Sequence, residues 1–317
     1  MPLLSIIQVS MVDAERQELM ANNDGKPTTD KPMVPEGREQ DVIDALTEAT
    51  SVTCFLLAID DDTAPTLTCS KIGGLPYWPK GVPFPVADPR GLAEDEGFAL
   101  LAQLDLADFG GDSRLPDHGL LQFFLTQDDV MGLFFDEPND TQKHFRVVWH
   151  EEIDPSVTEE SVRAQGILAS DPDGYFPIQG EHVLRVRSVE QGITPSDVRF
   201  DAAFKQVCTR LFGEGYDDPK RSWADYLTDD QLAEVCKLDD GDGSQHRVLG
   251  YPFFTQYDPR NEKDAESYDT LLLQLDTDFD ASSRVDWGDC GVGNFFINGE
   301  ALASGDFSHV LFNWDCY

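Results

Sequence analysis

The stretch LLAQLD at residues 100–105 returns later in the chain as LLLQLD at residues 271–276. Three further stretches return in the same order, namely GLPYW (residues 74–78) as GYPFF (250–254), GLLQFFL (119–125) as GVGNFFI (291–297), and VVWHE (147–151) as LFNWD (311–315). An ordered set of repeated motifs indicates one supersecondary unit that occurs twice. The sequence therefore predicts two copies of one unit, at about residues 70–152 and 245–317.

Short segments with a strand-like pattern occupy both copies and the region between them. They are rich in aromatic or branched residues and are bounded by Gly, Pro or Asp, which favours strands at residues 52–59, 98–106, 119–126, 132–136, 144–151, 182–189 and 310–314. Apolar residues at helical spacing predict helices near residues 42–49 and 196–211, and a third from Thr228, where Gln231 completes a capping box. We therefore expect an α+β fold of internally duplicated antiparallel β-meander units joined by a helical connector.

Residues 1–40 differ in composition from the rest of the chain. Residues 21–38 are polar and contain Gly and Pro at turn positions. Such segments are typical of linkers and frayed ends, so we expect residues 1–40 to form a flexible N-terminal extension. The remaining residues, 41–317, are expected to form a single domain that contains both copies.

The chain is strongly acidic. Its 317 residues include 60 Asp and Glu against 23 Lys and Arg, which gives a formal net charge of -37. A field of this sign repels nucleic-acid phosphates and anionic lipid headgroups, and therefore argues against a nucleic-acid partner and against a membrane. The favoured interpretation is that the acidic surface keeps the protein soluble, as in concentrated salt, because the charge is spread along the whole chain. The alternative is that an acidic face binds a basic protein, which is the one kind of partner that this charge suggests.

Cysteine and metal motifs indicate a reducing compartment and no cofactor. The six cysteines include no C-x-x-C pair and no Cys/His cluster at zinc spacing. The apolar stretch at residues 3–12 lacks a basic leading region and is shorter than a spanning helix. Residues 276–280 begin like a calcium-binding loop, but Ala281 and Trp287 stand where that loop requires Gly and Glu. We therefore expect a cytoplasmic protein with no metal and no cofactor.

Two matching loops carry the residue types of a catalytic site. Asp117 and His118 precede a strand of the first copy, and Asp289 and Cys290 precede the matching strand of the second. If the copies pack about a pseudo-twofold axis, the four side chains would form one set of acid, base and thiol in a shared cleft. The alternative is that they form structural turns together with Trp287, because a neighbouring carboxylate raises the pKa of a thiol and so weakens it as a nucleophile.

Two glutamines and one aromatic loop supply candidate binding residues. Gln103 and Gln274 occupy equivalent positions inside otherwise apolar strands, where a buried amide must find hydrogen-bond partners. They either tie a strand to a loop or line a binding cleft. Tyr77 and Trp78 lie in a proline-rich aromatic loop, which either forms a binding lip or closes the end of the sheet.

Several motifs together resemble those of the bacterial YwqG-like family. These are SKIGGLPYWP (residues 70–79), LAQLD (101–105), GLLQFF (119–124), FRVV (145–148), YPFFTQ (251–256), DPR (258–260), WGDCG (287–291) and NWDC (313–316). The resemblance extends over about residues 45–317, and the N-terminal extension lies outside it. It implies an α+β fold with internal duplication, and cytoplasmic members without an established activity. Some relatives are thought to lie near toxin and immunity genes, which implies a binding role.

Two functions therefore remain open. The first is a non-enzymatic cytoplasmic binding protein, immunity-like, that presents an acidic surface to a basic partner. The second is a hydrolase or transferase with a site in a cleft between the two copies. The sequence determines neither the identity of the ligand nor the oligomeric state.

Overall fold

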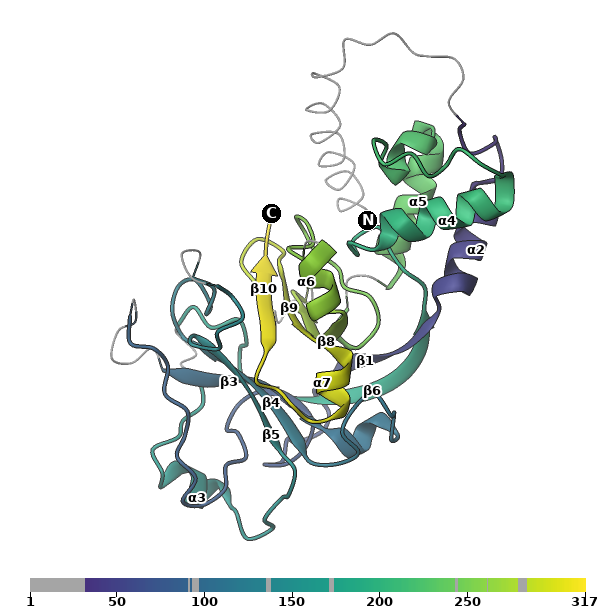
Figure 1. Cartoon of the computed structure of the whole chain (residues 1–317). Coiled ribbons are helices and arrows are strands. Elements are labelled where there is room, and N and C mark those ends of the chain that lie inside the picture. The colour runs from purple at the N-terminus through teal and green to yellow at the C-terminus, as the bar shows by residue number, and fades with distance from the viewer. Residues whose placement is uncertain are drawn as a thin grey trace. The chain divides into compact units, whose positions relative to one another are not determined.

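The computed structural model describes residues 32–90, 92, 97–134, 138–170, 174–242, 245–260, 262–278 and 284–317. Most of the expected N-terminal extension, residues 1–31, lies outside the described residues. The chain divides into two compact units, of which the helical unit comprises Met1–Ser51 and Gly192–Ser244 and the sheet unit comprises Val52–Gln191 and Gln245–Tyr317. Each unit therefore combines two separate stretches of the chain (Figure 1).

The sheet unit is built on one antiparallel sheet of ten strands. The strands are β1 (Val52–Asp60), β2 (Lys71–Gly73), β3 (Phe98–Asp105), β4 (Leu120–Thr126), β5 (Phe145–His150), β6 (Glu181–Gln191), β7 (Arg247–Val248), β8 (Thr270–Asp276), β9 (Val292–Ile297) and β10 (Val310–Asp315). Their order across the sheet is β10-β9-β8-β7-β1-β6-β2-β3-β4-β5. The connections contain the short helices α3 (Glu159–Arg163), α6 (Glu262–Ser267) and α7 (Gly299–Ala303) and the 3-10 turn η1 (Leu106–Phe109).

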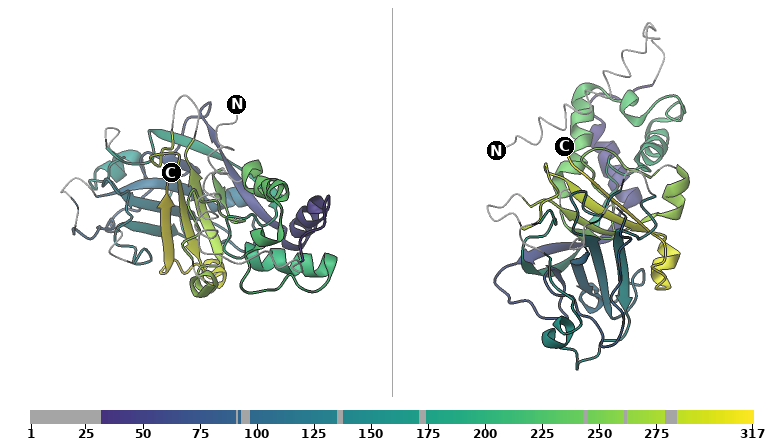
Figure 2. Two further views of the ribbon diagram at one scale, coloured as in Figure 1. Left: turned by 90° about the horizontal axis from the view of Figure 1, so that it is seen from above. Right: turned by 90° about the vertical axis from the view of Figure 1, so that its left-hand side faces the viewer.

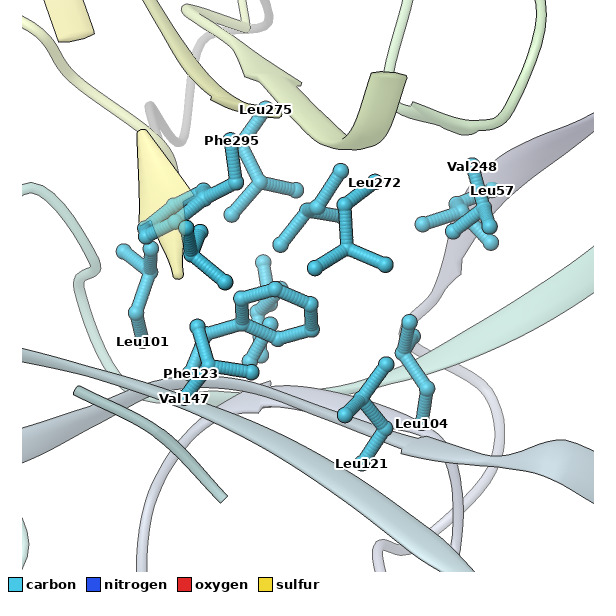
Figure 3. Packing of buried hydrophobic residues seen from close by; sticks show 14 of the residues in the cluster. Leu57, Leu101, Leu104, Leu121, Phe123, Val147, Val248, Leu272, Leu275 and Phe295 are labelled. Carbon is cyan, nitrogen blue, oxygen red and sulfur yellow. The ribbon is translucent and has the colours of Figure 1, made fainter. Parts of the chain in front are cut away.

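This sheet curls until it is nearly closed into a barrel. The strands β8 to β10 lie across from β3 to β5 (Figure 2), and the rings of Phe123 and Phe295 meet between them at 5.0 Å. Alternate side chains point inward from both ends of the sheet, because successive side chains of a strand face opposite sides. They form the main hydrophobic core (Figure 3). At about 25 cal/mol per Å² of apolar surface removed from water, this burial is the main force that holds the curled sheet together.

A buried glutamine links the two edge strands across the seam of the barrel. Gln142 precedes β5, and its side-chain amide donates to the backbone carbonyls of Phe307 (2.7 Å) and Ser308 (3.2 Å), which precede β10. Its side-chain carbonyl accepts the backbone N–H of Val147 on β5 (2.9 Å). Gln142 has a φ of 52°, a left-handed conformation that costs energy for any residue with a side chain. At this seam the side chain of Gln142 thus links β5 to the residues before β10, whereas neighbouring strands elsewhere in the sheet are linked by ladders of backbone hydrogen bonds.

The helical unit contains α2 (Glu39–Thr50), α4 (Phe200–Phe212), α5 (Asp229–Asp242) and the 3-10 turn η2 (Trp223–Tyr226). Val42 and Leu46, two apolar residues four positions apart, are both buried in α2. The capping box before α5 is present, because Gln231 Oε1 accepts the backbone N–H of Thr228 and Thr228 Oγ1 accepts that of Gln231. The three predicted helices are therefore confirmed.

The expected connectivity of the fold is wrong. The two meander units are not joined by a helical connector but form the two ends of one ten-stranded sheet. The region between them contributes β6, which pairs with β1 and β2 in the middle of the sheet, while α4 and α5 belong to the other compact unit. Periodicity identifies each strand separately, but pairing depends on contacts between residues far apart in the chain, which periodicity does not report.

The expected strand at residues 132–136 is also wrong in its described part. Residues 131–134 form a turn and an irregular stretch, and residues 135–136 lie outside the described residues. Asp128 Oδ1 accepts the backbone N–H groups of Val130 (3.0 Å) and Gly132 (3.3 Å), and Gly132 has a positive φ. Such local hydrogen bonds from an Asp side chain compete with strand formation.

Candidate functional site

The two ends of the sheet pair their strands in the same register. Gln103 lies opposite Gln122 in the β3–β4 pair, and Gln274 lies opposite Asn294 in the β8–β9 pair. Both pairs also shift their register at the corresponding place. These four side chains alternate with inward-facing residues, so they point away from the barrel core.

On β3 and β4 the two glutamines hold the aromatic loop in place. Gln103 Oε1 accepts the backbone N–H of Tyr77 (3.1 Å), and Gln122 Nε2 donates to the carbonyl oxygen of Tyr77 (2.8 Å) and to Gln103 Oε1 (2.8 Å). Gln103 Nε2 donates to the backbone carbonyls of Leu67 and Cys69. Both glutamines are fully buried. The expectation that Gln103 is a buried, hydrogen-bonded amide is therefore confirmed, and Gln103 ties a strand to a loop.

The polar side chains around these glutamines, here called the first polar cluster, are Lys71, Gln103, Gln122 and His150. Lys71 is almost fully buried, and its ammonium group donates to Glu181 Oε1 (2.7 Å) and to two backbone carbonyls. His150 Nε2 lies 3.0 Å from Gln122 Oε1, and burial lowers the pKa of His150 to about 4, so the ring is neutral at pH 7. Each of these side chains has a hydrogen-bond partner, as buried polar groups generally do.

The matching side chains at the other end of the sheet, here called the second polar cluster, are Arg247, Gln274, Asp276, Asn294 and Asp315. Gln274 Oε1 accepts the backbone N–H of Phe253 (2.8 Å), and Asn294 Nδ2 donates to the carbonyl oxygen of Phe253 (3.0 Å). Gln274 Nε2 donates to the backbone carbonyl of Gln245 (2.9 Å). Gln274 is thus also a fully buried, hydrogen-bonded amide, as expected.

Two acceptors of the second polar cluster have no partner. Asn294 Oδ1 and Asp276 Oδ2 are buried and accept no hydrogen bond within the described part of the chain. In the register of the strands, the position that His150 occupies beside Gln122 is taken in the second polar cluster by Asp315, which is another acceptor. A buried acceptor without a partner lowers the free energy of unfolding by about 1 to 3 kcal/mol. Arg247 takes the position of Lys71, so the second polar cluster lacks a donor only where the first one has His150.

Asp276 is the most strongly perturbed carboxyl group of this cluster. Burial raises the pKa of Asp276 to about 7, and the charge of Asp315 raises it further, while the backbone N–H of Thr277 and the charge of Arg247 act in the opposite direction. His246 Nδ1 accepts the backbone N–H of Asp276 (3.0 Å), and burial lowers the pKa of His246 to about 4. A neutral imidazole offers no positive charge to the carboxylate. Asp276 is thus close to its midpoint of titration at neutral pH.

Asp315 connects the second polar cluster with the surface. Its carboxylate accepts the backbone N–H groups of Thr255 (3.1 Å) and Gln256 (3.1 Å) and the hydroxyl of Thr255 (3.0 Å), while burial raises the pKa of Asp315. A hollow of about 310 Å³, here called the β10 hollow, lies beside it and is lined by Leu133, Phe134, Asn139, Gln256, Tyr257, Pro259, Asn313, Trp314 and Asp315. None of these described lining residues is a Lys, Arg or His.

The expected pair Asp117 and His118 lies in an exposed turn before β4. The side chain of Asp117 accepts a hydrogen bond from the His118 ring, and this contact raises the pKa of His118. The backbone carbonyl of His118 accepts Trp149 Nε1 (3.0 Å). Both residues thus serve a surface turn.

The expected pair Asp289 and Cys290 lies before β9 at the other end of the sheet. Burial raises the pKa of the Cys290 thiol, and the neighbouring Asp289 raises it further. A protonated thiol is a poor nucleophile. Over the described residue ranges, no hydrogen bond or ion pair joins this pair to Asp117 or His118. The structure therefore does not bring the four side chains together by direct contact.

Three aromatic residues expected near a site, Tyr77, Trp78 and Trp287, are all buried. The hydroxyl of Tyr77 accepts the backbone N–H of Asp154 (2.8 Å), and Trp78 Nε1 donates to the backbone carbonyl of Val82 (2.8 Å). Trp287 belongs to the main hydrophobic core. The aromatic loop thus covers the sheet, which is the second of the two alternatives for it.

The residues that distinguish the second polar cluster were missed in the sequence. Asn294 stands in GVGNFFI where Gln122 stands in GLLQFFL, and this correspondence is a signal that identifies both as partners of the repeated glutamines. Asp276 and Asp315 also lie inside repeated motifs. Their burial is not visible in a sequence with 60 acidic residues, because acidic side chains are mostly exposed in folded proteins.

Metal and membrane sites were examined over the same residue ranges. Among the described residues, no three His, Cys, Asp or Glu side chains are grouped so that they could hold a metal ion. The loop that begins like a calcium site runs into residues 279–283, which lie outside the described residues. No described helix combines the length and the apolar character needed to cross a membrane.

Comparison with models of protein families gives a match. The model of the family described as "Domain of unknown function (DUF1963)" matches residues 70–316, which is most of the chain. No curated protein matches the chain.

Proposed function

The chain belongs to the DUF1963 family, whose function is unknown, and we propose that it is a non-enzymatic binding protein whose second polar cluster engages a basic protein partner. The partner would add positive charge at Asp315, which lines the β10 hollow, to the single cation, Arg247, that the cluster already holds against two carboxyl groups. The formal net charge of -37 would guide a basic protein toward the acidic surface.

The observation that carries this proposal is the unbalanced charge of the second polar cluster. Asp276 and Asp315 face the same side of the sheet, on the two strands that flank β9, and each lies opposite Val292. Burial raises the pKa of both carboxyl groups, which means that their surroundings do not fully compensate the negative charge. A cationic group from a partner protein would compensate it.

The alternative function, a hydrolase or transferase, rests on Asp117, His118, Asp289 and Cys290. That chemistry needs an activated thiol, or an acid and a base within hydrogen-bond reach of each other. The raised pKa of Cys290 works against thiol activation. The catalytic function remains a prediction without a specific observation in its favour.

Several finer assignments belong to the same proposal. We propose that the chain is a YwqG-like protein of bacterial and cytoplasmic origin, and that its role is immunity-like. The motifs of residues 70–79 and 287–291 support the resemblance, and inhibitors of basic enzymes commonly present acidic surfaces. We also propose that the two ends of the sheet arose by internal duplication, which the matching strand registers support.

The proposal is tested by measuring binding of the full chain to an arginine-rich peptide and to a glutamate-rich peptide of the same length. We expect binding of the basic peptide alone. The affinity should fall by at least about tenfold between about 0.01 M and about 1 M salt, because the Debye length decreases from about 30 Å to about 3 Å. Equal binding of both peptides, or no binding of the basic one at low salt, would contradict the proposal. The second result would favour the interpretation of the acidity as an adaptation to salt.

A further inference from the structure

We infer that the β10 hollow is a pocket for the guanidinium group of an arginine side chain. The proposed function supplies the source of this arginine, a protein partner, but the chemistry of the pocket stands on its own geometry. The pocket lies along the edge strand β10, where no further strand of the sheet covers it.

The lining of the hollow fits a planar cation. Asp315 contributes a carboxylate to the lining, and the amide side chains of Asn139, Gln256 and Asn313 add further acceptors. Phe134, Tyr257 and Trp314 add aromatic rings, which attract cations through their faces. A guanidinium group has five N–H donors in one plane and stacks on rings, so it uses carboxylate, amide and aromatic contacts at the same time.

The size of the hollow limits what enters it. Its volume of about 310 Å³ lies at the lower end of the range for ligand pockets, which is about 300 to 1,000 Å³. This suits one side chain better than a cofactor-sized molecule. Tyr257 is 69% exposed and forms part of the rim, so the hollow is accessible from solvent.

A second, independent observation comes from the residues behind the hollow. Asp276 Oδ2 and Asn294 Oδ1 are fully enclosed and unpartnered, and both side chains share the sheet face of Asp315. The carbonyl dipole of Asn294 and the carboxyl group of Asp276, which the charge of Arg247 offsets only in part, add a negative potential that extends toward the hollow, because potentials are only weakly screened inside a protein. A cation bound at Asp315 is therefore stabilised by groups that it does not touch.

The chain already binds one of its own arginines in this manner nearby. Arg260 follows the lining residue Pro259, pairs with Asp258, and places its guanidinium carbon 4.1 Å from the ring centre of Phe296. Carboxylate and aromatic ring thus hold a guanidinium together at a neighbouring position on the sheet unit. The β10 hollow offers the same two elements without an arginine of its own among the described lining residues.

The test is a calorimetric titration of the full chain with N-acetyl-arginine amide, and with the citrulline analogue as a neutral control of nearly the same shape. We expect the arginine compound to bind at least about tenfold more tightly than the citrulline compound, a difference of about 1.4 kcal/mol. Equal affinities for the two compounds, or no saturable binding of the arginine compound, would overturn the inference.

Two variants locate the binding site. Asn313→Lys places a cation of the chain itself in the hollow, and Tyr257→Ala removes an exposed rim ring, so both should weaken arginine binding at least about tenfold with the fold intact. The matched controls are Asn313→Gln, which keeps the amide, and Glu160→Gln, which removes one exposed charge on α3. Arginine binding that persists unchanged in both Asn313→Lys and Tyr257→Ala would contradict the inference.

The two proposals fail in different ways. Arginine binding in the hollow without any binding of a basic peptide would retain the pocket and reject the basic protein partner. Binding of the basic peptide that is unaffected by Asn313→Lys and Tyr257→Ala would retain the partner and reject the pocket. Circular dichroism of each variant shows whether the fold is preserved.

Discussion

The first and second polar clusters occupy matching positions at the two ends of one sheet but differ in how their charges are balanced. In the first, Lys71 is paired with Glu181 and the amide of Gln122 meets His150. In the second, Asp276 and Asn294 each retain a buried acceptor without a partner. The same backbone frame thus holds one balanced and one unbalanced set of polar side chains.

Features that both clusters share indicate a structural role, and features found in the second cluster alone indicate a different role. In both clusters an amide pair binds the backbone N–H and C=O of one loop residue, Tyr77 in the first and Phe253 in the second. A feature present at both ends of the sheet is explained by the need to fix a loop on a strand. The unpaired acceptors occur in the second cluster only, so loop fixation does not explain them. The proposed binding role for that end of the sheet would explain them.

The largest expected effect concerns Asp276. Its pKa is raised from 3.8 to about 7 in the folded chain, so the folded protein holds a proton that the unfolded chain releases between these values. Stability should therefore decline as the pH rises from about 4 to about 7, by roughly 4 kcal/mol from this group. In Asp276→Asn this part of the decline should be absent. Urea unfolding of both proteins across this pH range measures the difference, and identical pH profiles would show that Asp276 is already compensated.

A smaller effect is expected from Gln103→Leu. The substitution leaves the buried N–H of Tyr77 and the carbonyls of Leu67 and Cys69 without their amide partner. Despite the added apolar area, the free energy of unfolding should fall by about 1 to 3 kcal/mol. Thermal or urea unfolding measures this change. A more stable Gln103→Leu protein would mean that the loop does not depend on the amide.

The two clusters are compared most closely by Gln122→Leu and Asn294→Leu. Gln122 has three side-chain contacts, whereas Asn294 donates to Phe253 and leaves its own oxygen unpaired. Gln122→Leu should lower the free energy of unfolding by about 1 to 3 kcal/mol. Asn294→Leu also removes an orphaned acceptor, so its decrease in the free energy of unfolding should be about 1 kcal/mol smaller. Equal losses in parallel urea unfolding would indicate that Asn294 is as well satisfied as Gln122.

The smallest effect expected for each charged residue is the effect of added salt on the melting temperature of the whole chain. Added salt screens the mutual repulsion of the acidic side chains, whose formal net charge is -37, so the melting temperature should rise with salt. A melting temperature that stays flat or falls between low and molar salt would mean that surface repulsion does not limit stability.

The sequence predicts the individual strands better than it predicts how they pair in the sheet. Aromatic and branched residues identify β1, β3, β4, β5, β6 and β10 within one or two residues, because strand preference is a property of short segments. The central position of β6 was not predicted, since its pairing with β1 joins residues such as Leu57 and Val186 that are far apart in the chain. The strand expected at residues 132–136 was wrong because local Asp128 hydrogen bonds form a turn there.

The candidate site could be predicted only in part. Gln103 and Gln274 stand out in the sequence because an amide repeats inside apolar runs. Asp276 and Asp315 do not stand out, since their importance comes from burial and from the donors that they lack. The β10 hollow depends on Leu133, Phe134, Asn139 and residues 256–259, which meet only in the folded sheet unit.

The most direct test of the difference between the clusters is the titration of Asp276 in the intact protein, followed by NMR of its side-chain carboxyl carbon. Its signal is assigned by comparison with Asp276→Asn. A carboxyl group that titrates with a pKa of about 7 is the expected result, because burial without full compensation favours the protonated form. A pKa near 4, the ordinary value of an aspartate, would show that the second polar cluster is as well balanced as the first and would contradict the binding role assigned to it.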